Sequence, residues 1–136
     1  MPKFGLRSIA RLNTCHPDLQ RVLSAAIADG PDFTILCGHR GAAEQAEACA
    51  KGLSKAPWPT SKHNALPSLA VDIAPYPIDW NDYARFRALA DHVMAHAARL
   101  GIRLRWGGDW DGDGLTARDG DKDERLIDLP HFELKG

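Results

Sequence analysis

The chain has 136 residues, which is the length of one ordinary domain and enough to bury a hydrophobic core. Its formal net charge of −1 gives no electrostatic indication of a nucleic-acid partner or an anionic membrane surface. No apolar run approaches the ~20 residues of a membrane-spanning helix, and the three cysteines form no Cys-x-x-Cys pair, so we expect no membrane insertion and free, mostly buried thiols.

The N-terminal segment contains Arg7 and Arg11 where a secretory signal would have its apolar region, so we expect synthesis in the cytoplasm without a signal peptide. Hydrophobic periodicity and runs of strand-forming residues then predict, in chain order, helix 17–28, strand 33–37, helix 42–51, strand 69–74, a helix from 81 or 82 to about 100, strand 102–106 and strand 129–134. Strands scattered between helices without a regular βαβ rhythm favour an α+β fold. Because no repeat or long linker divides the chain, residues 1–136 are predicted to form a single domain.

Two segments offer candidate metal ligands. Asp72 interrupts an otherwise apolar predicted strand, where a buried carboxylate is costly unless it is paired or bound to a metal. With His63 and His131 it makes the two-imidazole, one-carboxylate set of a zinc site that keeps a fourth position open for water. Asp128 is a candidate base for that water, and Glu133 points to the same side of its strand as His131 and could support it. From the residues alone, a zinc site and a set of unrelated polar side chains remain equally open.

A rival zinc site is suggested by His92 and His96, which share one face of the long predicted helix. Zinc peptidases that use such a helical pair need a glutamate directly after the first histidine, and Val93 stands there instead. The charged residues around the pair indicate a solvated helix surface. We therefore expect the functional zinc at the first set.

An acidic, glycine-rich loop is predicted over 109–124. Its first six residues match the opening of an EF-hand calcium loop, but Gly120 stands where the twelfth-position glutamate should be. The candidate calcium ligands are Asp109, Asp111, Asp113, Asp119, Asp121 and Asp123. A calcium site and a solvated acidic insertion remain equally open.

Four ordered motifs carry a resemblance to a known family: Cys37-Gly38-His39-Arg40 with Gln45, Ser61-Lys62-His63 with Ala70-Val71-Asp72, Trp106-Gly107-Gly108-Asp109-Trp110, and Asp128-Leu129-Pro130-His131-Phe132-Glu133-Leu134. Together they cover roughly residues 14 to 134. The chain resembles the phage-type peptidoglycan peptidases of the M15 family. This resemblance implies a hedgehog/D-Ala-D-Ala peptidase-like fold, a small antiparallel sheet packed with about three helices.

The resemblance also implies roles for individual residues. His63, Asp72 and His131 would be the zinc ligands, Asp128 the general base and Arg40 the group that stabilises carbonyl charge. Glu133, Ser61 and His39 would support the ligands or line the cleft. The segment between His63 and Asp72 is two residues longer than in the common family pattern, and we expect the extra residues to loop outward.

The function implied by the resemblance is a zinc-dependent endolysin that cleaves the L-Ala–D-Glu bond of the peptidoglycan stem peptide. The alternatives are a D-Ala-D-Ala carboxypeptidase or dipeptidase, and a non-catalytic zinc-containing binding module of the same fold. We expect a monomer without a wall-binding module that acts on the bacterial wall after release from the host cytoplasm.

Overall fold

The structure is a computed structural model that describes residues 2–54, 56–109 and 128–135. Its elements are, in chain order, α1 (Leu6–Leu12), α2 (Pro17–Asp29), β1 (Phe33–Cys37), α3 (Ala42–Ala50), the short 3₁₀ helix η1 (Lys62–Asn64), β2 (Ala70–Pro75), α4 (Tyr83–Leu100), β3 (Leu104–Trp106) and β4 (His131–Leu134). The predicted α+β fold is confirmed, with four α-helices among these residues instead of about three.

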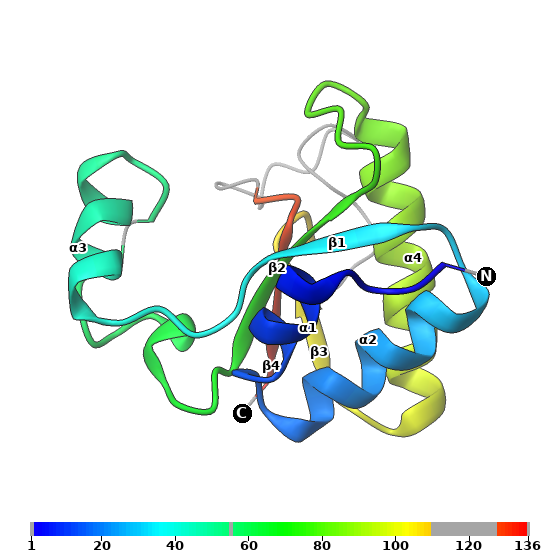
Figure 1. Cartoon of the computed structure of the whole chain (residues 1–136), viewed down its shortest axis with the longest axis horizontal. Helices are drawn as coiled ribbons and strands as arrows, with labels where there is room; N and C mark the ends of the chain where they lie inside the picture. Colours follow the sequence, from blue (N-terminus) through cyan, green and yellow to red (C-terminus); the bar gives the residue numbers. More distant parts are fainter. Residues whose placement is uncertain (1, 55, 110–127, 136) are drawn as a thin grey trace.

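The four strands form one antiparallel sheet in the order β1-β2-β4-β3. β4, the last strand in the sequence, therefore lies between β2 and β3 (Figure 1). Its register against β2 places Val71 opposite Phe132 and Asp72 opposite His131. A bulge in β1 brings Cys37 opposite Asp72 on the other side of β2. Cys37, Asp72 and His131 consequently form one row across three strands, although 94 positions separate the first from the last.

The main helices cover the sheet at one end of the molecule. α2 packs against α4, and α4 packs in turn against β2 and β3, while α3 stands away from them at the opposite side of the view (Figure 1). The helix predicted over 17–28 corresponds to α2, and its predicted apolar face is confirmed. The five apolar residues of that face are all buried: Leu19, Val22, Leu23, Ala26 and Ile27. None of the helices in the described part of the chain combines the length and the apolar character needed to cross a membrane.

Helix α1, which is only seven residues long, was not predicted from the sequence. Its Ser8 hydroxyl accepts a hydrogen bond from the backbone N–H of Ile35 (3.0 Å) and lies 3.0 Å from the Thr34 hydroxyl. Isolated helices of this length are marginal in water, so contacts of this kind with β1 stabilise α1 more than its own propensity does.

Candidate metal centre

The three predicted ligands meet at the carboxylate of Asp72. The His63 Nε2 atom lies 3.3 Å from Asp72 Oδ1, and His131 Nδ1 lies 3.2 Å from the same oxygen. Asp72 and His131 are brought together by the β2–β4 register, whereas His63 comes from η1. The imidazole rings of His63 and His131 are edge to face, with centroids 5.2 Å apart.

The second nitrogen of each imidazole has a partner that orients the ring. His63 Nδ1 lies 2.7 Å from the carbonyl oxygen of Gly38, which can only accept, so Nδ1 carries a proton and Nε2 is the nitrogen that faces Asp72. His131 Nε2 donates to Glu133 Oε1 at 2.9 Å, which leaves Nδ1 as the nitrogen that faces Asp72. Such second partners fix the tautomer and orientation of metal-binding histidines. This contact agrees with the supporting role predicted for Glu133, which stays a prediction.

The spacings of both imidazole nitrogens from Asp72 Oδ1 suit a zinc ion. In a tetrahedral site with bonds of ~2.0–2.1 Å, neighbouring donors lie ~3.3 Å apart. The two spacings around Asp72 Oδ1, 3.3 and 3.2 Å, match that edge length. Two neutral imidazoles and one carboxylate are also a donor set that zinc prefers. His63, Asp72 and His131 are therefore suited to hold such an ion with a further position available.

The charges at this point are strongly coupled. Burial opposes the protonated imidazole, but hydrogen bonds to Asp72 outweigh it and raise the pKa of His63 to about 10 and that of His131 to about 9. The pKa of Asp72 is held far below its ordinary value, because its histidine partners outweigh the effect of burial. Without a cation the imidazoles thus hold protons that offset the buried carboxylate, and a metal ion would take the place of that positive charge.

Arg40 belongs to a buried hydrogen-bonded cradle. Its Nη2 lies 3.6 Å from Asp72 Oδ2, and its Nη1 donates to Gln45 Oε1 at 2.9 Å. Gln45 is fully buried and also accepts from Asn64 Nδ2 (3.1 Å), while the Arg40 backbone N–H donates to the His63 carbonyl (2.7 Å). The guanidinium is therefore fixed beside the candidate metal ligands. The motif had named Gln45, but the structure adds its positioning contact with Arg40 and the part played by Asn64.

Asp128 is placed by the turn that precedes β4. Its backbone N–H donates to the Gly107 carbonyl (3.0 Å), and its carbonyl accepts from the His131 N–H (3.1 Å). A Cβ atom at Gly107 would lie 2.2 Å from the Asp128 carbonyl oxygen, so only glycine allows this approach. Burial, followed by the negative charge of Asp72, raises the pKa of the Asp128 carboxyl above its ordinary value.

These side chains share one cavity of about 840 Å³. Its lining includes Trp80 and all five residues predicted to bind the metal or take part in catalysis, namely Arg40, His63, Asp72, Asp128 and His131. Glu133 and Ser61 line it too, and residues from the end of α3 and the loop that follows form another wall. With an ion held by the candidate ligands, the arrangement would offer a metal, a carboxylate and a guanidinium to one bound molecule, which suits hydrolysis of a polar bond such as an amide.

Two predicted supporting residues act on the backbone of the His63 loop. The Ser61 hydroxyl accepts from the His63 N–H (3.2 Å), and His39 Nδ1 donates to the Ala65 carbonyl (2.9 Å). In the longer segment between His63 and Asp72, Leu66 is 72% exposed, which agrees with the expected outward loop. Ser68, two residues later, is buried.

Cys37 was missed as a neighbour of the candidate metal. Its Sγ atom and the ligand atoms of His63 and Asp72 all lie within 4.8 Å of one another. Burial opposes its ionisation, but the hydrogen bond with His63 outweighs this and lowers the pKa of the Cys37 thiol. Its place at the end of a predicted strand, as the first residue of the Cys37-Gly38-His39-Arg40 motif, was the sequence signal for it.

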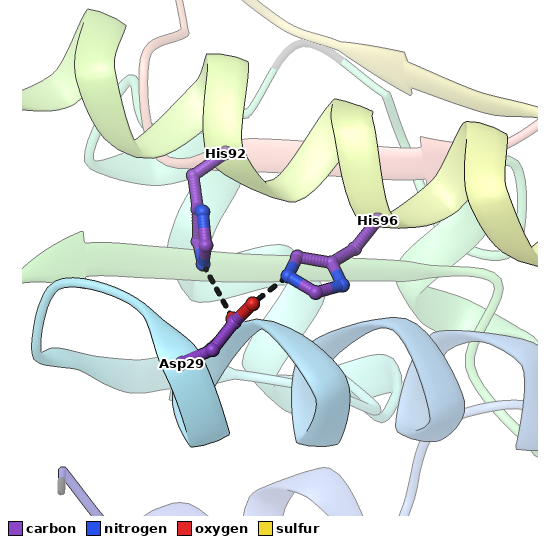
Figure 2. A group of neighbouring side chains, drawn as sticks. All are labelled: Asp29, His92 and His96. Carbon is purple, nitrogen blue, oxygen red and sulfur yellow. Dashed lines mark hydrogen bonds and ion pairs between the residues drawn. The ribbon is translucent and has the colours of Figure 1, made fainter.

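The expectation of a solvated surface around the rival histidine pair was wrong for His96, which is 7% exposed. The structure brings Asp29 of α2 to His92 and His96 of α4 (Figure 2). Tertiary packing of the two helices made this contact, because 63 positions separate Asp29 from His92.

The predicted calcium loop lies outside the described residues beyond Asp109. Its other candidate ligands, Asp111, Asp113, Asp119, Asp121 and Asp123, therefore remain sequence predictions.

Known proteins resemble this chain in sequence. The family model described as phage L-alanyl-D-glutamate peptidase matches residues 1–135. The chain is 40% identical, over 116 residues, to the L-alanyl-D-glutamate peptidase of Escherichia phage T5, covering 82% of this chain and 84% of that relative.

Two solved structures are similar to this fold. The Serratia marcescens L-Ala D-Glu endopeptidase ChiX has a TM-score of 0.76 and 29% identity, covering 99% of this chain and 90% of that one. The vancomycin resistance D,D-pentapeptidase VanY, solved as an E175A mutant in complex with Zn(II), has a TM-score of 0.50 and 23% identity, covering 93% and 71%. At that identity the second likeness shows the fold alone.

Proposed function

We propose that this chain, which belongs to the phage L-alanyl-D-glutamate peptidase family, hydrolyses the L-Ala–D-Glu bond of peptidoglycan stem peptides at a zinc centre held by His63, Asp72 and His131. The observation that carries the proposal is the convergence of two oriented imidazole nitrogens on Asp72 Oδ1 at tetrahedral spacing. This arrangement lies in the cavity that also contains Asp128 and Arg40.

In the proposed reaction, side chains of the cavity transfer the proton and stabilise the developing charge. The chemistry that zinc supplies in such a site is Lewis acidity, which polarises a carbonyl group and makes water a stronger acid. Asp128 accepts the proton of the attacking water and returns it to the leaving amine, so that acid and base catalysis use one carboxyl group. Arg40, held by Gln45, faces the negative charge that develops on the carbonyl oxygen.

The ligand and base assignments can be separated by metal content. His63→Ala, Asp72→Ala and His131→Ala should each lose zinc and activity together, because each removes one of only three protein ligands. Asp128→Asn should keep its zinc and lose turnover by about 10²–10⁴-fold, since the water then lacks its base. An Asp128→Asn protein that hydrolyses peptidoglycan at the parental rate would remove Asp128 from the mechanism and make Glu133 the next candidate.

The scissile bond is tested by mass spectrometry of purified peptidoglycan after digestion. The proposal expects new N-terminal D-Glu, with L-Ala retained on the glycan. Release of D-Ala alone would assign the carboxypeptidase activity instead, and no change in any muropeptide would favour a binding module. The presence of Asp128 and Arg40 in the cavity supports an enzyme over such a module, because a structural zinc site needs neither group. The monomeric state and action on the wall after release stay predictions.

A further inference from the structure

We propose a second divalent-metal site, distinct from the peptidase centre, in which Asp29 of α2 and His92 and His96 of α4 bind one ion and join the two helices. Figure 2 shows the three side chains converging between the helices. The site does not depend on the proposed function, because it uses none of the residues assigned to the catalytic zinc.

The spacing of the donor atoms supports this site. Asp29 Oδ1 lies 3.2 Å from His92 Nε2 and 2.8 Å from His96 Nε2, and all three donor atoms lie within 4.8 Å of one another. A tetrahedral zinc site has donors ~3.3 Å apart, so the second spacing needs to open by only about half an ångström. The imidazole centroids are 4.8 Å apart, close to the 5.2 Å between His63 and His131.

The chain leaves room for the His92 ring at Gly30. A Cβ atom at Gly30 would lie 1.9 Å from His92 Nε2, so a side chain there would displace the imidazole. The Gly30 backbone has φ −129° and ψ −166°, an extended conformation that any residue can adopt. The absence of a side chain is therefore required by the imidazole and not by the backbone.

Without an ion the same residues form hydrogen bonds between the helices. His92 Nε2 donates to the Ala26 carbonyl (2.8 Å) and His96 Nε2 donates to Asp29 (2.8 Å). α2 has no basic residue in its last turn, and His92 supplies a hydrogen-bond donor to the Ala26 carbonyl there. Binding an ion through the same Nε2 atoms replaces these two N–H donors by one cation, so each imidazole then carries its proton on Nδ1.

The donor chemistry selects the class of ion. Two imidazoles and a carboxylate favour zinc and other late first-row divalent ions over calcium or magnesium, which prefer oxygen ligands. The Asp29 side chain is 54% exposed, so water can complete the coordination.

The first test measures zinc content by equilibrium dialysis of the full chain against zinc, followed by elemental analysis. The double variant His92→Gln with His96→Gln should lose one equivalent of zinc relative to the parent. The glutamine amides can still donate to the Ala26 carbonyl and to Asp29 but are poor zinc ligands. His16→Gln is the control, since it removes a histidine at the other end of α2 and should keep the parental zinc content.

The second test leaves all three donors in place. Gly30→Ala should also lose the equivalent of zinc, because the new methyl group displaces His92. In a melting experiment, the melting temperature of the parent should rise by roughly 9 °C when zinc is raised to about 100 times its dissociation constant at this site, whereas neither variant should show this rise.

Two results would overturn the proposal. One is equal zinc content in the parent protein and the glutamine double variant. Asp29, His92 and His96 would then only form hydrogen bonds between the helices. The other is an additional zinc equivalent that persists in both the glutamine and the Gly30→Ala variants, since the ion would then be bound elsewhere. If either variant fails to fold, the zinc content of the other decides.

Discussion

Replacing Glu133 by glutamine should weaken zinc binding while leaving the catalytic base in place. Glu133 is 9% exposed, and its two oxygens have different partners: Oε1 accepts from His131 Nε2 (2.9 Å) and Oε2 pairs with Lys62 Nζ (3.0 Å). These cationic partners outweigh the effect of burial and hold the pKa of Glu133 below its ordinary value, so the group is ionised. Glutamine has a single oxygen acceptor and no charge, and can satisfy only one of the two donors.

The magnitude follows from the lost contact. A hydrogen bond to a charged group contributes about 1.5–3 kcal/mol, and losing a second partner of a metal-binding histidine costs about 10–100-fold in metal affinity. Since a factor of ten corresponds to about 1.4 kcal/mol, the two ranges agree. We expect the zinc dissociation constant of Glu133→Gln to rise by about 10–100-fold, with turnover near the parental value once zinc is saturating.

The assay is competition for zinc with a chromophoric chelator, together with peptidoglycan hydrolysis at saturating zinc. Arg105→Gln is a suitable control, because Arg105 Nη1 lies 3.9 Å from Glu133 and does not contact His131 through any described hydrogen bond. Its zinc affinity should stay within about twofold of the parent, as for a surface ion pair. Parental zinc affinity in Glu133→Gln would refute the orienting role, and parental affinity with lost turnover would identify Glu133 as the base.

Three further predictions concern the cradle, the core and the loop. Gln45→Ala should lower the free energy of unfolding by about 2–4 kcal/mol and reduce turnover more than zinc content, because it leaves Arg40 Nη1 and other buried groups without their partner. Chemical denaturation measures the stability, metal analysis the zinc content and peptidoglycan hydrolysis the turnover. Unchanged turnover would contradict the positioning of Arg40 by Gln45. Phe132→Ala should lower the free energy of unfolding by about 3–5 kcal/mol in the same denaturation assay, since the fully buried ring of Phe132 belongs to the hydrophobic core. A loss below about 1 kcal/mol would show that neighbouring side chains fill the space left by the ring. Millimolar calcium should raise the melting temperature and lytic rate of zinc-loaded protein, with Asp111→Ala and Asp113→Ala together removing both effects, and a calorimetric titration without calcium binding would leave the loop a solvated insertion.

The sequence by itself determined most of the fold. Helical periodicity identified the buried face of α2, and runs of strand formers identified the four strands to within two residues at each end. β3 and β4 begin two residues later than expected, at Leu104 and His131, because pairing between strands decides where a short strand begins. α1 was not predicted because it is stabilised by contacts with β1 and not by its own helix propensity.

The sequence also determined the members of the candidate metal centre. A carboxylate inside an apolar strand is costly enough that Asp72 stands out locally, and four ordered motifs then pointed to His63 and His131. The contacts among these residues, which support the assignments without testing them, come from the fold. A one-residue change in the β2–β4 register would turn His131 away from Asp72, and no local signal in either strand specifies that register.

Only the tertiary structure revealed the remaining neighbours. Cys37 reaches the metal ligands through a bulge in β1, and Asp29 reaches His92 and His96 through the packing of α2 on α4. Each pairing joins residues that are far apart in the chain and ordinary in their own segments. Local sequence encodes what a side chain can do, whereas strand register and helix packing decide which side chains do it together.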